Sequence, residues 1–175
     1  MVHVFGTICL DRLRIVPHLP EPGAYVEIET ESLHLGGEGA NTATALLDWG
    51  IPVVFTGNPI GEDLVWAALE RGIEVKPTAG ADTPFCDIYL TPNGERTMFG
   101  MGFSEGGPVA VFEEADWFTS DSNFGDVPME AARLAKAKSQ RLYVMDAVVP
   151  DGLLGPADFW QTSTAMAGIK GAIEG

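Results

Sequence analysis

Hydrophobic residues along the chain follow two different periods in turn. Short continuous apolar runs, typical of buried strands, alternate with segments in which apolar residues recur every three to four positions, as on one face of a helix. The apolar runs predict strands at Val2–Cys9, Pro52–Thr56, Trp117–Ser120, Leu142–Asp146 and Asp158–Gln161. The helical periods predict helices at Ala40–Trp49, Glu62–Arg71 and Met129–Lys138. Strands that alternate with helices predict an α/β fold, in which a mainly parallel sheet is flanked by helices.

Two segments of the chain have a different pattern, with apolar and polar residues in alternation and Pro and Gly at the corners. They lie at about 12–35 and 85–103 and predict short antiparallel strands. In the second segment, Phe85–Thr91 and Glu95–Gly100 flank Pro92-Asn93-Gly94. Because Asn-Gly readily takes the positive φ angles of a tight primed turn, this segment predicts a β-hairpin.

Two of the predicted helices end at a glycine. Gly50 and Gly72 stand where the left-handed residue of a helix C-cap would fall. In the second helix the expected buried face is made of residues at helical spacing, namely Leu64, Val65, Ala68 and Leu69.

The length of the chain favours one domain with one core. With 175 residues, of which 46% are hydrophobic, the chain is long enough for one domain and short for two. Residues 162–175 are mostly small and show little periodicity. Since a parallel-sheet domain should not stop at an unsupported strand, we expect 1–175 to be a single incomplete α/β domain, the front portion of something longer.

Composition and charge exclude several classes of partner. The formal net charge is -15, and the ten basic residues are scattered, so we expect neither nucleic acid nor an anionic membrane as a partner. No apolar run approaches the roughly 18 residues of a spanning helix, and the first run lacks a charged leader. Cys9 and Cys86 have no metal-like spacing. The pattern predicts a cytoplasmic protein with reduced thiols and no metal site.

The stretch LHLGGEGANTATALLDWG, residues 33–50, carries the candidate binding chemistry. It matches neither phosphate motif, because Thr42 replaces the third glycine of a dinucleotide fingerprint and no Gly-Lys-Ser/Thr ending is present. Its glycines let a ligand approach the backbone, where the first N–H groups of the helix are free to donate. Asn41 can donate and accept, whereas Glu38 would oppose a phosphate, so a neutral polyol fits better. A purely structural turn before a helix is the alternative.

Four motifs together resemble those of the ribokinase-like PfkB carbohydrate kinases. They are GTICLD, GGEGAN, TGNPIGEDLVWAALERGIEV and NGERTMFGMG, and they come in the order and spacing of that family over residues 1 to about 162. The resemblance implies a ribokinase-like α/β fold, a mainly parallel sheet with a small antiparallel β-lid formed by the segments at about 12–35 and 85–103. The C-terminal part of the family fold is then missing from the chain.

The resemblance also implies an acceptor site for the hydroxyls of a sugar or nucleoside. On this chain the residues implied are Asp11, Gly36, Gly37 and Asn41. A charged acceptor suits hydroxyl donors, at about 1.5 to 3 kcal/mol per hydrogen bond to a charged group.

Further expectations concern the lid and two strand ends. The lid of the family closes over the sugar and often forms a dimer interface, so Phe99 and Met101 would present apolar surface to the ligand. Asp121 falls where some members carry a sugar-contacting carboxylate, and Asp146 similarly ends a strand at the ligand-facing edge. The alternative for Phe99 and Met101 is that they pack between the lid and the core. The alternative for the two aspartates is that each is merely a helix cap or a loop residue.

The chain differs from the family in its catalytic machinery. Complete members use ATP and Mg²⁺, and the resemblance places their base and anion hole in a late Gly-Ala-Gly-Asp loop, which these 175 residues do not contain. Where the family has Asn-x-x-Glu, this chain has Ser163-Thr164-Ala165-Met166. We therefore expect an acceptor site without cofactor or catalytic residues, and a chain that is inactive alone. It would be a kinase fragment, a short non-catalytic sugar-binding or dimerisation module, or a subunit completed by a C-terminal polypeptide.

Overall fold

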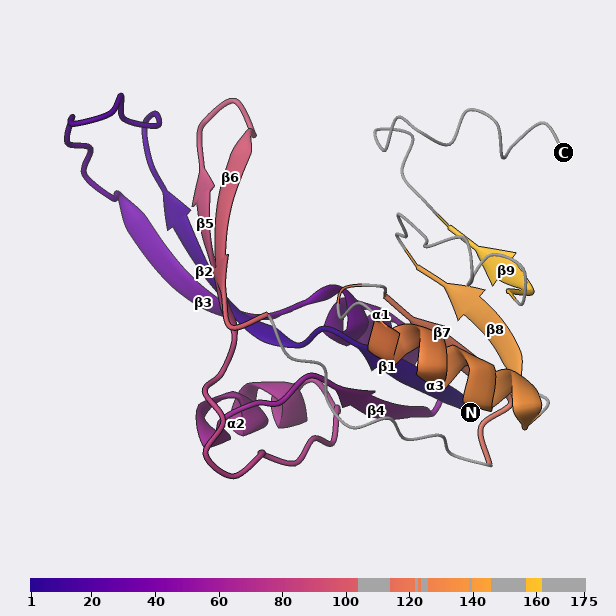
Figure 1. The fold of residues 1–175 in the computed structure, drawn as a ribbon. Helices are drawn as coiled ribbons and strands as arrows, with labels where there is room; N and C mark the ends of the chain where they lie inside the picture. The colour runs from indigo at the N-terminus through magenta and orange to yellow at the C-terminus, as the bar shows by residue number, and fades with distance from the viewer. Residues whose placement is uncertain (104–113, 122, 124–125, 139, 146–156, 162–175) are drawn as a thin grey trace, which may run out of the picture.

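The computed structural model describes residues 1–103, 114–121, 123, 126–138, 140–145 and 157–161, which form two sheets and three helices (Figure 1). The main sheet is entirely parallel, with strand order β4-β1-β7-β8-β9. Its strands are β1 (Val2–Gly6), β4 (Val53–Gly57), β7 (Trp117–Ser120), β8 (Arg141–Val144) and β9 (Phe159–Trp160). The predicted parallel sheet is confirmed.

Alternate residues of the main sheet belong to two separate cores, one on each face. Val4 packs in the core that α1 (Glu38–Asp48) and α2 (Glu62–Glu70) cover, whereas its neighbour Phe5 packs beneath α3 (Asp126–Ala137). Successive side chains of a strand point to opposite faces, so one short apolar strand contributes to both cores. This is why the strands read as continuous apolar runs in the sequence.

The helix ends follow the glycine signals. Gly50 and Gly72 both have a φ of 74°, and the residue after each donates its N–H back across the last turn of its helix. These are the hydrogen bonds of a Schellman motif, as predicted. The predicted buried face of α2 is partly wrong, because Leu64, Ala67 and Ala68 are buried while Leu69 is 53% exposed.

A second sheet projects from one end of the main sheet (Figure 1). It contains β2 (Cys9–Ile15), β3 (Thr30–Gly36), β5 (Phe85–Leu90) and β6 (Arg96–Met101), in the order β3-β2-β5-β6. The outer pairs β2–β3 and β5–β6 are antiparallel, but the central pair β2–β5 is parallel. The expected sheet is present, and it is mixed rather than wholly antiparallel because two hairpins meet side by side.

The turn between β5 and β6 differs from the predicted primed turn. Gly94 donates its N–H to the Thr91 carbonyl, which makes Pro92 and Asn93 the central residues of the turn. The ring of Pro92 fixes a negative φ, so a primed turn, which needs a positive φ there, is excluded. Gly94 takes the left-handed conformation after the turn, with a φ of 84°.

The first predicted strand is also interrupted. Val2–Cys9 was expected to be one strand, but β1 ends at Gly6 and β2 begins at Cys9. Thr7 and Ile8 carry the chain from the main sheet to the second sheet. We call these two residues the crossover, and the candidate site is built around it.

Candidate functional site

Buried side chains hold the crossover from both sides. The Ile8 N–H donates to Asn58 Oδ1 at 2.8 Å, and Asn58 Nδ2 donates back to the Ile8 carbonyl at 3.0 Å. On the other side, the Thr7 N–H donates to Asp121 Oδ2 at 2.6 Å. Asn58 follows β4 and Asp121 follows β7, the two strands that flank β1. The carboxyl ends of three neighbouring parallel strands therefore meet at the crossover.

Glycines bring the start of α1 against the crossover. A Cβ atom at Gly39 would lie 2.8 Å from the Gly6 carbonyl carbon, and one at Gly37 would overlap the Thr7 carbonyl group. Gly37 also has a φ of 96°, a left-handed conformation that favours glycine. The glycine-rich stretch is thus needed for close backbone packing, whatever else it binds.

Three N–H groups at the start of α1, those of Gly39, Ala40 and Asn41, already have acceptors within the protein. Ala40 donates to the Thr7 carbonyl at 3.1 Å, and Asn41 donates to the Gly37 carbonyl at 2.9 Å. The expectation that these helix-start groups are free to bind a ligand is therefore wrong. The sequence does not reveal this, because the acceptor on Thr7 is brought to the helix by the sheet-to-sheet crossover.

Asp121 has a structural role at this junction. It is fully buried, and desolvation raises the pKa of its carboxyl group, while hydrogen bonds from the backbone N–H groups of Thr7, Asn123 and Gly39 act in the opposite direction. Its two oxygens serve the crossover and the loop after β7. The structure gives no exposed surface through which Asp121 could contact a sugar. Asp146, the other strand-ending candidate, lies outside the described residues.

Asp11 and Gly36 come together at the base of the second sheet. A Cβ atom at Gly36 would coincide with the Asp11 carboxylate, so the missing side chain of Gly36 makes room for that carboxylate. Partial burial raises the pKa of Asp11, while a hydrogen bond from the Cys9 thiol (Sγ to Oδ1, 3.3 Å) and the nearby His34 and Arg96 lower it. Among the described ion pairs, none involves Asp11. The carboxylate therefore keeps acceptor capacity at a half-buried position.

The strand register fixes which side chains share a face with Asp11. Asp11 pairs with His34 on β3 and with Cys86 on β5, and two residues along the strands Ile88 pairs with Met98. Residues in register, or two apart, lie on one face of a sheet. We call this the Asp11 face.

Met101 and Phe99 lie on the opposite face of the second sheet, which we call the outer face. Met101 pairs with Phe85 and Phe99 pairs with Asp87, one residue out of phase with the Asp11 face. They are 62% and 59% exposed. The expectation that these two side chains face a ligand together with Asp11 is wrong, because a one-residue error in phase moves a side chain to the other face. Met98, which precedes Phe99, lies on the Asp11 face and is exposed there, although the sequence pattern did not single it out.

Asn41 is an exposed residue in the first turn of α1. Near it the sequence analysis missed a polar cluster centred on Asn123, whose Nδ2 donates to Glu38 Oε2 at 3.1 Å and to Thr7 Oγ1 at 3.0 Å. Polar contacts thus link the loop after β7 to both the helix start and the crossover. No described contact joins Asn41 to Asp11.

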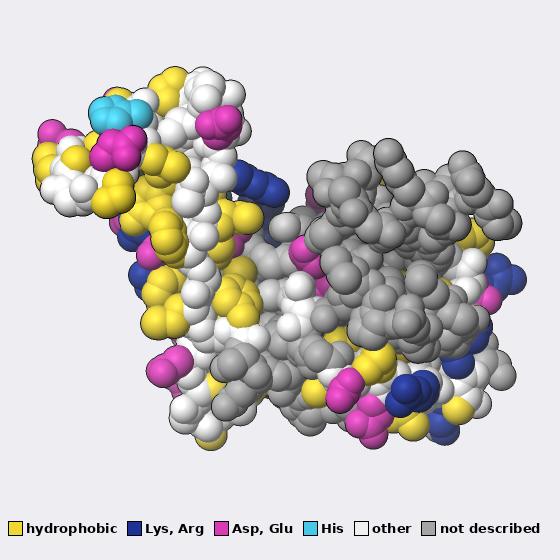
Figure 2. Space-filling view, turned by 45° about the horizontal axis from the view of Figure 1, so that its top comes forward, with side chains coloured by type: hydrophobic (Ala, Val, Ile, Leu, Met, Phe, Trp, Pro, Cys, Tyr) yellow, Lys and Arg dark blue, Asp and Glu magenta, His cyan; other side chains and the backbone are white. Residues whose placement is uncertain are grey.

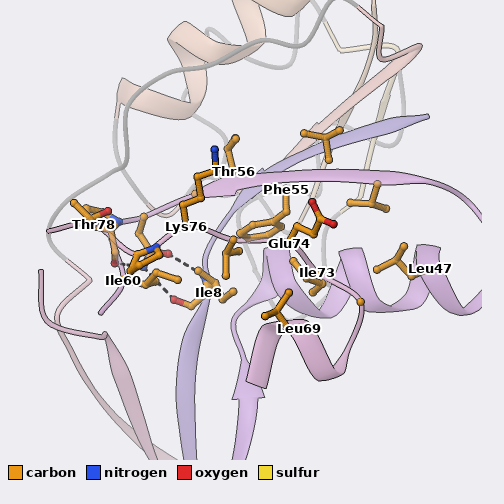
Figure 3. A pocket seen from close by; sticks show the side chains of 18 residues that line it. Ile8, Leu47, Phe55, Thr56, Ile60, Leu69, Ile73, Glu74, Lys76 and Thr78 are labelled. Carbon is orange, nitrogen blue, oxygen red and sulfur yellow. Dashed lines mark hydrogen bonds between the residues drawn. The ribbon is translucent and has the colours of Figure 1, made fainter. Parts of the chain in front are cut away.

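A large hollow lies elsewhere, away from Asp11 and the start of α1. It has a volume of about 1100 Å³ and lies between β4, α2 and residues 73–78 (Figure 3). Its wall is mostly apolar, with Ile8, Phe55 and Leu69 among the side chains drawn in Figure 3. The amide group of Asn58, which also lines it, is already bonded to the backbone of Ile8. Thr56, Glu74, Lys76 and Thr78 line it too, but none of the residues predicted for the acceptor site does, so we do not assign the acceptor site to this hollow.

The described part of the chain has neither a metal-binding cluster nor a membrane-spanning helix. No group of three or more His, Cys, Asp and Glu side chains there could hold a metal ion. No helix in that part is long and apolar enough to cross a membrane.

Sequence comparison identifies two similar curated proteins. An uncharacterized sugar kinase of Dictyostelium discoideum is 24% identical over 189 residues, which cover 83% of this chain and 53% of that protein. The uncharacterized sugar kinase YegV of Escherichia coli (strain K12) is 33% identical over 112 residues, covering 59% of this chain and 33% of that protein. No protein-family model matches the chain.

Solved structures share the fold. Ribokinase of Arabidopsis thaliana, complexed with ribose and ATP, superposes with a TM-score of 0.75 at 18% identity over 91% of this chain and 58% of its own. The ribokinase of Cryptococcus neoformans in complex with ADP gives a TM-score of 0.73 at 18% identity, over 85% of this chain and 50% of its own. The chain is thus similar in sequence to two proteins described as sugar kinases and has the fold of the ribokinases. This ribokinase-like chain spans about half the length of the first relative and of these neighbours.

The role of Asp121 in the ribokinase-like chain can be tested by mutation. Asp121→Ala leaves the buried Thr7 N–H without its acceptor, so we expect the free energy of unfolding to fall by about 2 to 3 kcal/mol. Asp121→Asn keeps an acceptor oxygen and should be destabilised less. The free energy would be measured by urea denaturation monitored by tryptophan fluorescence.

Asp116→Ala is the control for this series. Asp116 pairs with the N-terminal amino group at 2.9 Å but is 74% exposed, so its removal should change the free energy of unfolding by less than about 1 kcal/mol. Equal effects of the two alanine variants would refute the structural role of Asp121.

Proposed function

We propose that the ribokinase-like chain carries the acceptor-binding part of a carbohydrate or nucleoside kinase, with Asp11 as the residue that accepts hydrogen bonds from sugar hydroxyls. The observation that carries the proposal is the position of the Asp11 carboxylate, which fills the space left open by Gly36 and has no ion-pair partner among the described residues. An ionised carboxylate in such a position favours hydroxyl donors.

The surroundings of Asp11 agree with a sugar ligand. Asp11 shares its face with apolar side chains, Ile88 and Met98, that could pack against the C–H groups of a sugar ring. Ribokinase of Arabidopsis thaliana, which has the same fold, was solved with ribose and ATP. We place Gly36, Gly37 and Asn41 in the same proposed site, where Gly36 leaves room for the Asp11 carboxylate, Gly37 lets α1 begin against the crossover, and Asn41 would add an amide at the edge.

No phosphoryl-transfer step is assigned to the described residues. ATP and Mg²⁺ are expected for complete family members, but the N–H groups at the start of α1, which could otherwise cradle a phosphate, are engaged by Thr7, Gly37 and Asp121. The neighbouring Glu38 carboxylate would repel an anion. The start of α1 therefore does not fit a nucleotide phosphate. We propose that the transfer chemistry belongs to a segment outside these 175 residues.

The Asp11 proposal predicts a specific loss of binding. Asp11→Asn removes the charge of the acceptor and should weaken sugar or nucleoside binding by about 10- to 100-fold, as expected for one or two charge-assisted hydrogen bonds. Isothermal titration calorimetry against pentoses, hexoses and nucleosides would measure this loss. Asp87→Asn, on the outer face of the same sheet, is the control and should leave affinity unchanged.

The same titration should depend on pH. Because burial raises the pKa of Asp11, the carboxylate becomes protonated at a higher pH than an ordinary aspartate with a pKa of 3.8. Affinity should therefore fall as the pH is lowered through this raised pKa and should be flat above it. Binding that Asp11→Asn does not weaken, or that acid does not affect, would contradict the assignment.

We also propose that the outer face of the second sheet forms a homodimer interface. Leu33, Phe99 and Met101 expose apolar surface there. Beside them Arg12 and Arg14 pair with Asp87. Figure 2 shows hydrophobic side chains along the projecting sheet. Exposed apolar side chains with fixed charges nearby are typical of protein–protein interfaces.

Phe99 and Met98 are neighbours on β6 but lie on opposite faces, so variants of the two test which face forms the interface. Phe99→Glu, on the outer face, should convert a dimer into a monomer in light scattering, since it places a charge in the apolar centre of the interface. Met98→Glu changes the next residue on the same strand, 53% exposed on the Asp11 face, and should leave the dimer intact. A wild-type monomer at high concentration would remove the dimer proposal.

A further inference from the structure

Arg96 lies on the same face of the second sheet as Asp11. It pairs with Leu90 on β5, and Leu90 is two residues from Ile88. Since Ile88 belongs to the Asp11 face, Arg96 belongs to it too. Its side chain is exposed. The face that carries the proposed acceptor carboxylate therefore also carries a guanidinium group.

The arginines of the outer face are held by contacts that Arg96 lacks. Arg12 and Arg14 both lie within ion-pair distance of Asp87, and the guanidinium group of each lies over an aromatic ring. Among the described residues, no ion pair, side-chain hydrogen bond or ring contact involves Arg96. A guanidinium group presents its N–H donors in a planar fork that matches a carboxylate. No described residue occupies this fork on Arg96.

The side chain of Arg96 is turned toward the base of the second sheet. In register Arg96 stands level with Ile15, four residues along β2 from Asp11. Burial raises the pKa of the Asp11 carboxyl group and of the Cys86 thiol, and the positive charge of Arg96 lowers both. Coulomb interactions weaken with distance and are screened by water and salt. The guanidinium group therefore lies over the Asp11 face and does not extend away from it.

His34 adds a second polar group beside the carboxylate. It pairs in register with Asp11, and a positive charge on its ring also lowers the pKa of Asp11. Between this level and Arg96, the face carries the apolar side chains of Ile88 and Met98. The Asp11 face thus has an acceptor near its base, an apolar middle and a donor group on each side of the acceptor.

The balance of charge on this face differs from that of the whole chain. The net charge of -15 gives most of the surface a field that is unfavourable for anions. On the outer face, two arginines are matched by Glu31 and Asp87. Among the residues of β2, β3, β5 and β6, Asp11 is the only acidic residue on the Asp11 face. If Asp11 accepts hydrogen bonds from neutral hydroxyls, the charge of Arg96 is left unmatched in the complex.

We propose that the acceptor of this site is a sugar acid, whose hydroxyls bind Asp11 and whose carboxylate binds Arg96. The inference rests on the proposed acceptor site and adds a specificity-determining residue to it. One guanidinium group matches a singly charged carboxylate through two parallel hydrogen bonds. A phosphate would bring a further negative charge toward Asp11 and fits less well. The carboxylate lies toward the free end of the second sheet, away from Glu38 at the start of α1.

The test compares sugars that differ only in one terminal group. Isothermal titration calorimetry would use glucose, glucuronate and glucose 6-phosphate, and the corresponding galactose series. The wild-type protein should bind an acid about tenfold more tightly than its neutral sugar, and more tightly than the phosphate. Arg96→Gln should abolish this preference and leave the affinity for the neutral sugar unchanged. Arg71→Gln, exposed at the C-terminal end of α2, makes the same change in net charge and should keep the preference.

Salt dependence gives a readout that does not need a variant. Raised salt should weaken binding of the acid and leave binding of the neutral sugar unchanged. Circular dichroism checks that Arg96→Gln remains folded.

The outcomes separate this inference from the acceptor proposal on which it rests. Neutral sugars that bind through Asp11 without any preference for the acid would overturn the inference and leave the acceptor proposal standing. The same holds if Arg96→Gln weakens acid and neutral sugar equally, as a simple counter-ion of Asp11 would, or if the phosphate binds most tightly. If the wild-type protein binds no sugar and no acid, both proposals are overturned.

Discussion

The backbone at Thr7 and Ile8 is the constraint on which the described structure depends. Here the chain leaves one sheet and enters another, so neither N–H group can be paired by a strand neighbour, and both hydrogen bonds are buried. An unpaired buried donor costs about 1 to 3 kcal/mol, so two such groups would use a large share of the stability of a small domain. Asn58 and Asp121 remove this cost by supplying side-chain acceptors from the ends of the two flanking strands.

The same constraint decides where a ligand can bind. The hydrogen bonds that hold the crossover place the Thr7 carbonyl against the start of α1. This carbonyl accepts the Ala40 N–H, and the close approach requires glycine at positions 37 and 39. A ligand therefore finds few free donors at the helix start. Asp11, three residues beyond the crossover, instead projects a half-buried carboxylate over Gly36. The acceptor chemistry of the proposed site thus lies on the second sheet, beside the glycine stretch rather than within it.

Much of the fold could be predicted from local patterns, because strands, helices and glycine caps are properties of short segments. β7 has the predicted bounds, and both glycine caps have the predicted geometry. The interruption at Gly6 was missed because the apolar run continues from one sheet into the next. The parallel pairing of β2 with β5 was also missed, since pairing between distant strands leaves no local signal.

The site was less predictable for the same physical reason. Asp11 lies near the start of β2 and Asp121 directly follows β7, so the two aspartates look alike in the sequence. Asp11 is half-buried and keeps acceptor capacity, whereas Asp121 is fully buried. A shift of one residue along β6 exchanges its two faces, and for this reason the sequence prediction put Met101 on the wrong face of the second sheet. Asn58 and Asn123, which hold the junction together, carry no distinguishing sequence pattern, although a polar residue directly after a buried strand is a signal that could be searched for.

Amide hydrogen exchange at the crossover, measured by nuclear magnetic resonance, tests the central claim most directly. If the Thr7 and Ile8 N–H groups are held by Asp121 and Asn58, both should exchange as slowly as the β1 amides of Val4 and Phe5, and Asn58→Ala should accelerate Ile8 more than Thr7. Fast exchange of Thr7 and Ile8 in the wild-type protein, while the β1 amides remain protected, would contradict the account.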